Sequence, residues 1–445
     1  MMIACLLAGM VFIAIMLAVV RVPFRYSLRS LTVRWKTTLL TSLAFTLVIS
    51  LVTVMLGFVN GMSRLLEGTG RQETVLVLDE GATDEVFSEL NPESIADVEW
   101  LPQVVRDPES GRPLASRETY MVVSVPVPNT RQIERRFFQV RGVEDPLVAA
   151  AVHDVRLRDG GRWFSDGAIE HMPVEDGQGA QRTVIEAVLG PGAAQRLAAY
   201  RTPTGDVGSR SHRRLNEGDR FFLGERTWIV TGIMDTANSA VSAEVWAKRS
   251  LVGSLFSEEG VTTLAIRTRD AASARQFKDF LNREFQTARI SAQVESDYYA
   301  EMSEMNQRLL MATIIVTLVT SIGGAISVMN TMYAAVSQRT YEIGLLRVLG
   351  YSRFQVLTCF LRESLMIGSM GGLLGCVLGA IANNLAATSV VSSPSGGGKY
   401  VDFRLWISPE TLASGMLLVL IMCLPGGLLP ALSAMRKRPL DAIGN

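Results

Sequence analysis

Uncharged hydrophobic runs and charged segments alternate along this chain. Five runs contain no Asp, Glu, Lys or Arg and are long enough to cross a bilayer for most or all of their length: residues 1–20, 37–63, 309–338, 364–398 and 411–435. Arginine and lysine gather in residues 21–36, 339–353 and 436–438, which the positive-inside rule places in the cytoplasm. The pattern predicts an α-helical polytopic membrane protein.

The long polar stretch between the second and third runs predicts a large α+β extracytoplasmic domain over residues 61–305. Short segments rich in β-branched and aromatic residues predict its strands. The expected elements are strands at residues 74–78, 120–125, 136–143 and 183–189, a hairpin over residues 220–233 that turns at Gly224-Glu225, and a β-α-β unit over residues 261–294.

A short charged helix is predicted between the third and fourth runs, in residues 337–351. Its apolar positions are Ile343, Leu346 and Leu349, with Leu345 and Val348 beside them, and its polar positions are Arg339, Glu342 and Arg347. Gly350 is predicted to end this helix, because glycine adopts the left-handed cap easily. Ser352 and Gln355 predict a capping box that starts the next helix.

This segment resembles the cytoplasmic coupling loop of the MacB/LolC/FtsX family of ABC-transporter permeases. The family pattern is Arg, two residues, Glu-Ile-Gly, two residues, Arg, two residues, Gly. It is matched here by Arg339, Glu342, Ile343, Gly344, Arg347 and Gly350. The order of one membrane helix, a large outer domain and three further helices also resembles the family. A generic amphipathic helix in the lipid headgroup layer is the alternative reading of the segment alone.

The resemblance implies that the chain is a permease subunit with a MacB-like outer domain and an FtsX-like permease domain over residues 306–445. It implies a homodimer or heterodimer of permeases in the cell (inner) membrane, in contact with membrane lipid. A separate cytoplasmic ABC ATPase would hold ATP and Mg²⁺ and receive the matched residues in a groove. The expected action is export or extraction of a lipoprotein, peptide or amphipathic substrate by mechanotransmission. FtsX-like activation of a cell-wall hydrolase and a membrane-anchored binding or scaffold protein stay open as alternatives.

The N-terminus departs from the four-helix pattern. Residues 1–21 predict an extra membrane anchor rather than a signal peptide, because the basic residues follow the apolar run instead of preceding it. A start site placed too far upstream is the alternative. Residues 22–36 predict an amphipathic cytoplasmic elbow helix, followed by a membrane helix over residues 37–60.

Small residues in the fourth run indicate close helix packing. Gly371, Gly375 and Gly379 recur every four residues, a spacing that lets helix backbones approach each other in lipid. The contact lies either within one subunit or between two permeases, and the sequence leaves both open.

Composition and motifs argue against other classes of function. Lys plus Arg and Asp plus Glu both total 43, so no basic excess indicates nucleic-acid binding. Residues 395–400 (SGGGKY) lack the first glycine and the final Ser or Thr of a phosphate-binding P-loop. His153, His171 and His212 are scattered, which is more typical of structural or solvent-facing histidines than of a metal site. The chain is therefore expected to hold no cofactor or metal and to catalyse no reaction itself.

Overall fold

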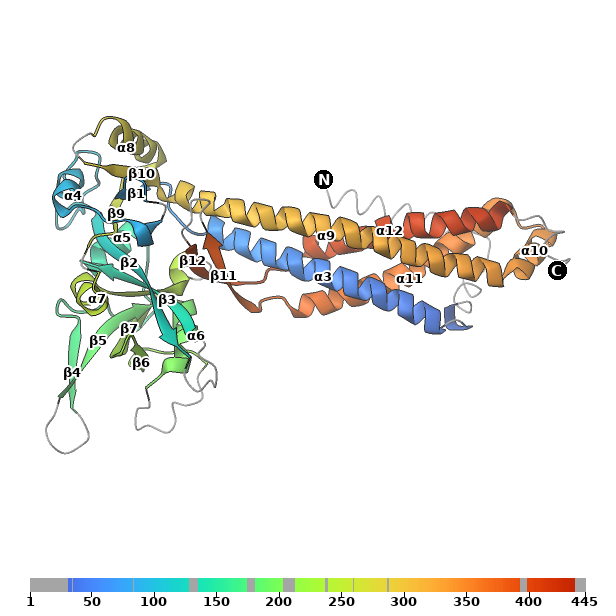
Figure 1. Ribbon diagram of the computed structural model, residues 1–445, viewed down its shortest axis with the longest axis horizontal. Helices are drawn as coiled ribbons and strands as arrows, with labels where there is room; N and C mark the ends of the chain where they lie inside the picture. Colours follow the sequence, from blue (N-terminus) through green and yellow to red (C-terminus); the bar gives the residue numbers. More distant parts are fainter. Residues whose placement is uncertain are drawn as a thin grey trace. The chain divides into compact units, whose positions relative to one another are not determined.

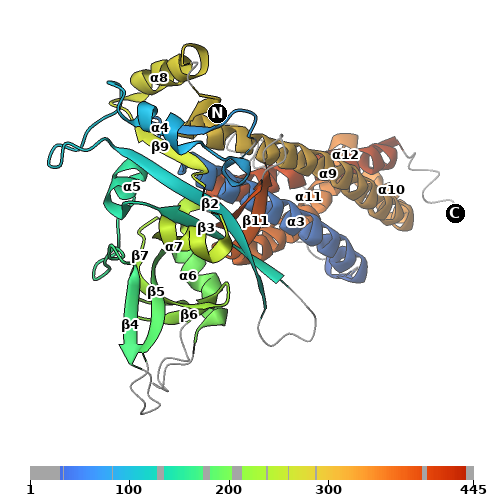
Figure 2. The same ribbon diagram turned by 60° about the vertical axis from the view of Figure 1, so that its left-hand side comes forward.

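The computed structural model describes residues 31–33, 35–82, 84–127, 135–173, 181–202, 213–236, 239–258, 260–285, 288–392 and 398–436 (Figures 1 and 2). The predicted N-terminal anchor, most of the predicted elbow helix and the first half of the SGGGKY segment lie outside these residues. The chain divides into a helical unit (residues 1–62, 307–385 and 404–445) and a sheet unit (residues 63–306 and 386–403).

The helical unit is built on long apolar helices that lie side by side (Figures 1 and 2). Within the described residues, four helices are long and apolar enough to cross a membrane, which confirms the four predicted family-type helices. They are α3 (Trp35–Glu67), α9 (Glu295–Gln338), α11 (Arg353–Ile381) and α12 (Pro409–Arg436). Helix α9 runs unbroken through residues 298–310, where the sequence contains neither proline nor glycine.

The predicted fourth membrane run, residues 364–398, is wrong at its C-terminal end. Helix α11 stops at Ile381, and β11 (Ala386–Ser392) pairs with β12 (Gly398–Arg404) in a two-stranded sheet. The sequence of β11, AATSVVS, is uncharged but rich in β-branched residues, which favour a strand. Absence of charge therefore does not distinguish the end of the helix from the strand that follows it.

The apolar core of the helical unit draws on each of its helices. Its buried side chains include Phe45 and Ile49 of α3, Val328 of α9, Leu361 of α11 and Val419 of α12. Each is at most 5% exposed within the chain.

The sheet unit contains a ten-stranded sheet among its described residues. The strands are β1 (Thr74–Asp79), β2 (Ala115–Pro126), β3 (Arg135–Val143), β4 (Ile169–Pro173), β5 (Gln181–Leu189), β6 (Arg220–Leu223), β7 (Arg226–Ile233), β8 (Glu244–Lys248), β9 (Thr263–Arg267) and β10 (Ile290–Val294). Their order is β10-β1-β9-β2-β3-β8-β5-β7-β6, and β4 pairs with β5. The pairs β3–β8 and β5–β7 are parallel, and the others are antiparallel.

Local sequence explains two connections of this sheet. Gly224 and Glu225 both have positive φ (57° and 64°), as a two-residue turn between twisted strands requires, so the predicted hairpin is confirmed. Strands β9 and β10 both pair with β1, and α8 (Ala271–Arg283) connects them. The predicted β-α-β unit is therefore present, with β1 inserted between its two strands.

Shorter helices complete the sheet unit. They are α4 (Pro92–Glu99), α5 (Pro146–His153), α6 (Pro191–Leu197), α7 (Arg249–Phe256), η1 (Glu85–Phe87), η2 (Ala198–Tyr200) and η4 (Ala240–Ala243). Proline starts α4, α5 and α6, where its missing N–H costs no helical hydrogen bond. Together these elements confirm the predicted fold class, a helical membrane-type protein with a large α+β domain.

Candidate functional site

The predicted coupling helix is α10 (Thr340–Val348), between α9 and α11. Gly350 follows it with a φ of +92°, a conformation that glycine adopts without a Cβ penalty. Ser352 and Gln355 form the predicted capping box: the Ser352 amide donates to the Gln355 side chain at 2.8 Å, and the Gln355 amide donates to the Ser352 hydroxyl at 3.2 Å. The predicted sequence of helix, tight turn and next helix is thus confirmed.

One side of α10 is buried within the chain and the other is exposed. Ile343 is 2% exposed and packs in the core of the helical unit, and Gly344 is also buried. Leu345 and Val348 are 46% and 62% exposed. The predicted apolar face is therefore wrong in part, because Ile343 lies on the inner side. The exposed apolar residues, which we call the outer face of α10, are Tyr341, Leu345, Val348 and Leu349.

The predicted polar side of the helix is wrong for Arg339, which does not lie on the exposed side. It is buried, one helical turn before Ile343, and its Nη1 lies 3.4 Å from Glu363 Oε2 on α11. Its Nε lies 3.8 Å from Glu342 Oε2, whose side chain is exposed. A guanidinium removed from water is costly unless a carboxylate compensates it. The pair between Arg339 and Glu363 therefore fixes the start of α10 to α11.

The remaining matched residues shape the end of the helix. Arg347 Nη1 donates to the Tyr351 carbonyl oxygen at 3.2 Å, across the turn that contains Gly350. Sequence reasoning missed Glu363. Its signal was a carboxylate immediately before an uncharged run, in a position where a buried charge needs a partner.

The predicted glycine stripe faces α3 within the same chain. A Cβ at Gly371 would lie 2.6 Å from Phe45 Cβ, one at Gly375 would lie 2.9 Å from the Thr46 backbone oxygen, and one at Gly379 would lie 2.6 Å from Thr53 Cγ2. Such distances are too short for a real Cβ, so only glycine permits this approach. The stripe therefore packs inside the subunit.

A second buried charge cluster lies in the sheet unit, around Arg141 of β3. Its guanidinium donates two hydrogen bonds of 2.8 Å to Glu244, one of 3.1 Å to Glu85, and another to Glu118. Arg141, Glu85, Glu118 and Glu244 are each at most 2% exposed. The guanidinium also lies 4.7 Å from the centre of the Tyr120 ring. This arrangement satisfies the buried charges by direct pairing.

His153 links this cluster to the first residue of α9. Its Nε2 lies 2.8 Å from Glu118 and its Nδ1 lies 2.9 Å from Glu295. Burial alone would lower the pKa of His153, but the two carboxylates outweigh burial and raise it to about 10. Burial would raise the pKa of Glu118, whereas His153 and Arg141 lower it to about 2. His153 is therefore a cation, and its two ion pairs fix the start of α9 to the sheet.

Sequence reasoning missed this cluster, which we call the Arg141 cluster, because its members come from six separate elements. An arginine between Val140 and Val143, near the end of a predicted strand, is the signal that could have indicated it. Within the described residues, no group of three or more His, Cys, Asp or Glu side chains is arranged to hold a metal ion.

Two known protein families match this chain, one over its first membrane helix and outer domain and the other over its C-terminal helices. The family described as MacB-like periplasmic core domain matches residues 38–283, more than half of the 445 residues. The family described as FtsX-like permease C-terminal matches residues 314–439, which include α10.

Individual relatives carry related names. The macrolide export ATP-binding/permease protein MacB of Bdellovibrio bacteriovorus is 28% identical over 234 residues, which cover 48% of this chain and 34% of that protein. The uncharacterized ABC transporter permease YknZ of Bacillus subtilis is 32% identical over 136 residues, 30% of this chain and 32% of that protein. The match thus spans about a third of each relative. The crystal structure of the extracellular domain of the noncanonic ABC-type transporter YknZ aligns at 11% identity and a TM-score of 0.31, over 49% of this chain and 99% of that one.

Proposed function

This chain belongs to the family of ABC-transporter permeases that combine a MacB-like periplasmic core domain with an FtsX-like permease region, and from that premise we propose that it couples a separate cytoplasmic ATPase to movements of its own extracytoplasmic domain. ATP and Mg²⁺ bind the ATPase in this scheme. The chain acts in the inner membrane, as a homodimer or with a second permease, on a lipoprotein, peptide or amphipathic substrate.

The observation that carries the proposal is that one side of α10 is buried within the chain while the other side is exposed and apolar. Its outer face presents an aromatic and three aliphatic side chains, although burial of apolar surface is the main driving force for association. Its inner side is held by Ile343 in the core and by the ion pair between Arg339 and Glu363. A helix seated in this way can receive a partner on one face and pass its displacement to α11 through the other.

Burial also changes the roles that we propose for the matched residues. Glu342 is exposed beside the outer face, so it can pair with a basic residue of the ATPase and set the register of docking. Arg339, Ile343 and Gly344 seat the helix on the permease rather than entering the ATPase groove. A bulky residue at Gly344 therefore perturbs packing within the permease before it affects docking.

Two features support transmission toward the extracytoplasmic domain. Helix α9 is continuous from Glu295 to Gln338, and a helix moves as a semi-rigid rod. Its first residue, Glu295, is bound to His153, which in turn is bound to Glu118 of the sheet. Displacement of α9 would thus reach the sheet through charge pairs that cannot separate without a large energetic penalty.

The test replaces two outer-face residues together, Leu345→Asp and Val348→Asp, in a chain co-expressed with its cytoplasmic ABC ATPase. Loss of a central apolar contact typically costs about 2 kcal/mol or more, which weakens binding by about 30-fold. We expect ATPase co-purification to fall accordingly while insertion and size-exclusion behaviour stay unchanged. Leu147→Asp is the matched control, since Leu147 is at least as exposed as Leu345 and Val348 but belongs to the sheet unit. Undiminished ATPase binding by the folded double variant would refute the proposal.

A further inference from the structure

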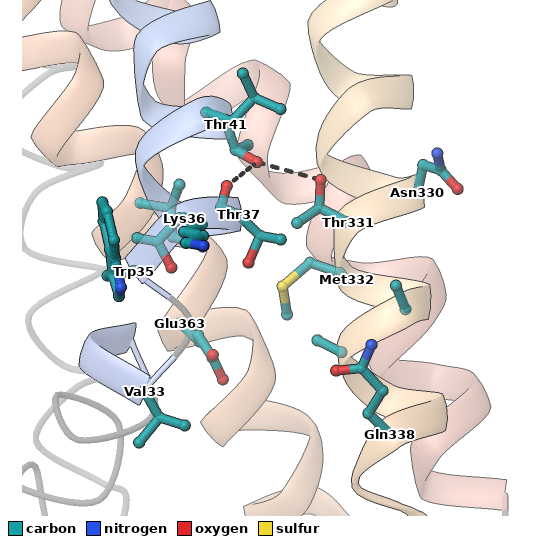
Figure 3. A pocket seen from close by; sticks show the side chains of 15 residues that line it. Val33, Trp35, Lys36, Thr37, Thr41, Asn330, Thr331, Met332, Gln338 and Glu363 are labelled. Atoms are coloured by element: carbon teal, nitrogen blue, oxygen red, sulfur yellow. Dashed lines mark hydrogen bonds between the residues drawn. The ribbon is translucent and has the colours of Figure 1, made fainter.

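A pocket of about 430 Å³ lies between α3, α9 and α11 within the helical unit. Figure 3 shows Thr41 and Thr331 at one end of it, where their hydroxyl oxygens lie 3.2 Å apart and join α3 to α9. Toward the other end are Gln338 of α9 and Glu363 of α11, and Lys36 of α3 lies beside Thr37. The volume falls in the range of about 300–1,000 Å³ that ligand sites occupy.

The pocket lies where three uncharged runs end. Lys36 immediately precedes the run over residues 37–63, Gln338 is the last residue of the run over residues 309–338, and Glu363 immediately precedes the uncharged part of α11. All three ends are on the side that the positive-inside rule places in the cytoplasm. The pocket is therefore at the depth of the lipid headgroups of the cytoplasmic leaflet.

The length of α11 supports this depth. At about 1.5 Å per residue, its 29 residues extend well beyond the hydrocarbon core of about 30 Å. Its first turns, up to Glu363, can therefore lie in the headgroup layer while the uncharged remainder spans the core.

The pocket wall offers opposite charges and neutral hydrogen-bonding groups together. Lys36 supplies an ammonium, and Glu363 supplies a carboxylate that also pairs with Arg339. Thr41 and Thr331 supply hydroxyl oxygens that can accept, because their hydrogens are donated to backbone carbonyls of their own helices. Leu40, Met332 and Ile367 add apolar surface. A complementary ligand carries an anion and a cation close together and is attached to a hydrocarbon chain. In a membrane, a zwitterionic phospholipid has this chemistry.

We propose that this pocket binds the headgroup of a phosphatidylethanolamine-type lipid from the cytoplasmic leaflet. Lys36 holds the phosphate, and Glu363, whose Oε2 also faces Arg339, accepts a hydrogen bond from the primary ammonium. The choline headgroup carries no N–H, so it cannot donate to Glu363, and the glycerol headgroup carries no cation. The site goes beyond the proposed ATPase coupling and does not depend on it.

The test measures lipid binding to the full chain directly, by native mass spectrometry in mild detergent. Dioleoyl phosphatidylethanolamine, phosphatidylcholine and phosphatidylglycerol are titrated separately. A hydrogen bond to a charged group is worth about 1.5–3 kcal/mol, so we expect the ethanolamine lipid to bind at least about tenfold more tightly than the choline lipid. Glu363→Gln should abolish this difference, and Lys36→Gln should weaken all three lipids. Glu410→Gln, on the exposed first turn of α12, is the matched control and should change nothing.

Equal binding of the ethanolamine and choline lipids by the parent chain would overturn the proposal, and so would a preference that survives Glu363→Gln. Because Glu363 also pairs with Arg339, that variant is checked by size exclusion. If it does not fold, Glu363→Asp takes its place. That variant keeps the negative charge opposite Arg339 but withdraws the carboxylate by one methylene, and it should reduce the preference for the ethanolamine lipid. A preference that Glu363→Asp leaves unchanged, or affinities that Lys36→Gln leaves unchanged, would also refute the assignment.

Discussion

Replacement of Gly375 by alanine should destabilise the helical unit, because Gly375 of α11 lies directly against α3. The added Cβ would lie 2.8 Å from Ile49 Cβ and 2.9 Å from the Thr46 backbone oxygen. Neither atom can move cheaply, since one is attached to the helix backbone and the other belongs to it. Overpacking of this kind typically costs about 1–3 kcal/mol. The helices must separate to accept the methyl group, so their other contacts weaken as well.

The matched control is Gly323→Ala on α9, where nothing lies within 4 Å of the added Cβ. In an open position the same change raises helix propensity by up to about 1 kcal/mol. The two substitutions therefore have opposite expected signs, although both add one methyl group to a glycine of an apolar helix.

The assay uses the natural thiols of the chain. Cys359, Cys376 and Cys423 are buried in the helical unit, and the sheet unit contains no cysteine. A thiol-reactive fluorophore therefore reports unfolding of the helical unit, once Cys5 has been replaced by serine in every variant. We expect Gly375→Ala to lower the thermal midpoint by about 2–4 °C for each kcal/mol lost. Equal midpoints for Gly375→Ala and Gly323→Ala would show that α11 does not pack on α3 in this way.

Two further predictions concern the Arg141 cluster of the sheet unit. The pKa of His153 is raised in the folded state, so its ion pairs stabilise the fold fully below the ordinary histidine pKa of 6.5. This stabilisation of the fold is lost as the pH rises through about 10. In tryptophan-fluorescence unfolding, the stability difference between the parent and His153→Gln should therefore shrink from pH 6 to pH 10, and a constant difference would contradict the ion pairs. Arg141→Met leaves buried carboxylates without their cation and should cost about 3–5 kcal/mol, whereas Arg117→Met breaks a partly exposed pair with Glu99 and should cost about 1 kcal/mol or less. Similar losses for the two variants in denaturant titrations would refute that reasoning.

The elements that could be predicted from the sequence are those with local signals. Runs without charge located the four long helices, Gly350 and the Ser352–Gln355 pair located the end of α10 and the start of α11, and Gly224-Glu225 located a hairpin. Each signal depends on residues within one turn or one helix of each other. The resemblance at residues 339–350 likewise came from one short segment, and the family comparison confirms it.

The buried charge pairs and the inward-facing side of α10 could not be predicted from the sequence, because they depend on residues that are distant along the chain. Arg339 is a polar residue at the start of a short helix, and the carboxylate that compensates its burial, Glu363, lies 24 positions away. A nine-residue helix offers too few turns for periodicity alone to decide which apolar side faces inward. The Arg141 cluster combines Glu85, Glu118 and Glu244 with a histidine and the start of α9, and no local pattern brings these residues together.

The most direct test of the central proposal is site-specific photocrosslinking from the outer face of α10. The photoreactive residue p-benzoylphenylalanine is placed at Leu345, at Val348 or at Leu147, in a chain co-expressed with its cytoplasmic ABC ATPase. We predict a covalent adduct with the ATPase from the two positions on α10 and none from Leu147 in the sheet unit. Absence of an adduct from both α10 positions in a membrane-inserted chain, or an ATPase adduct from Leu147, would contradict the account.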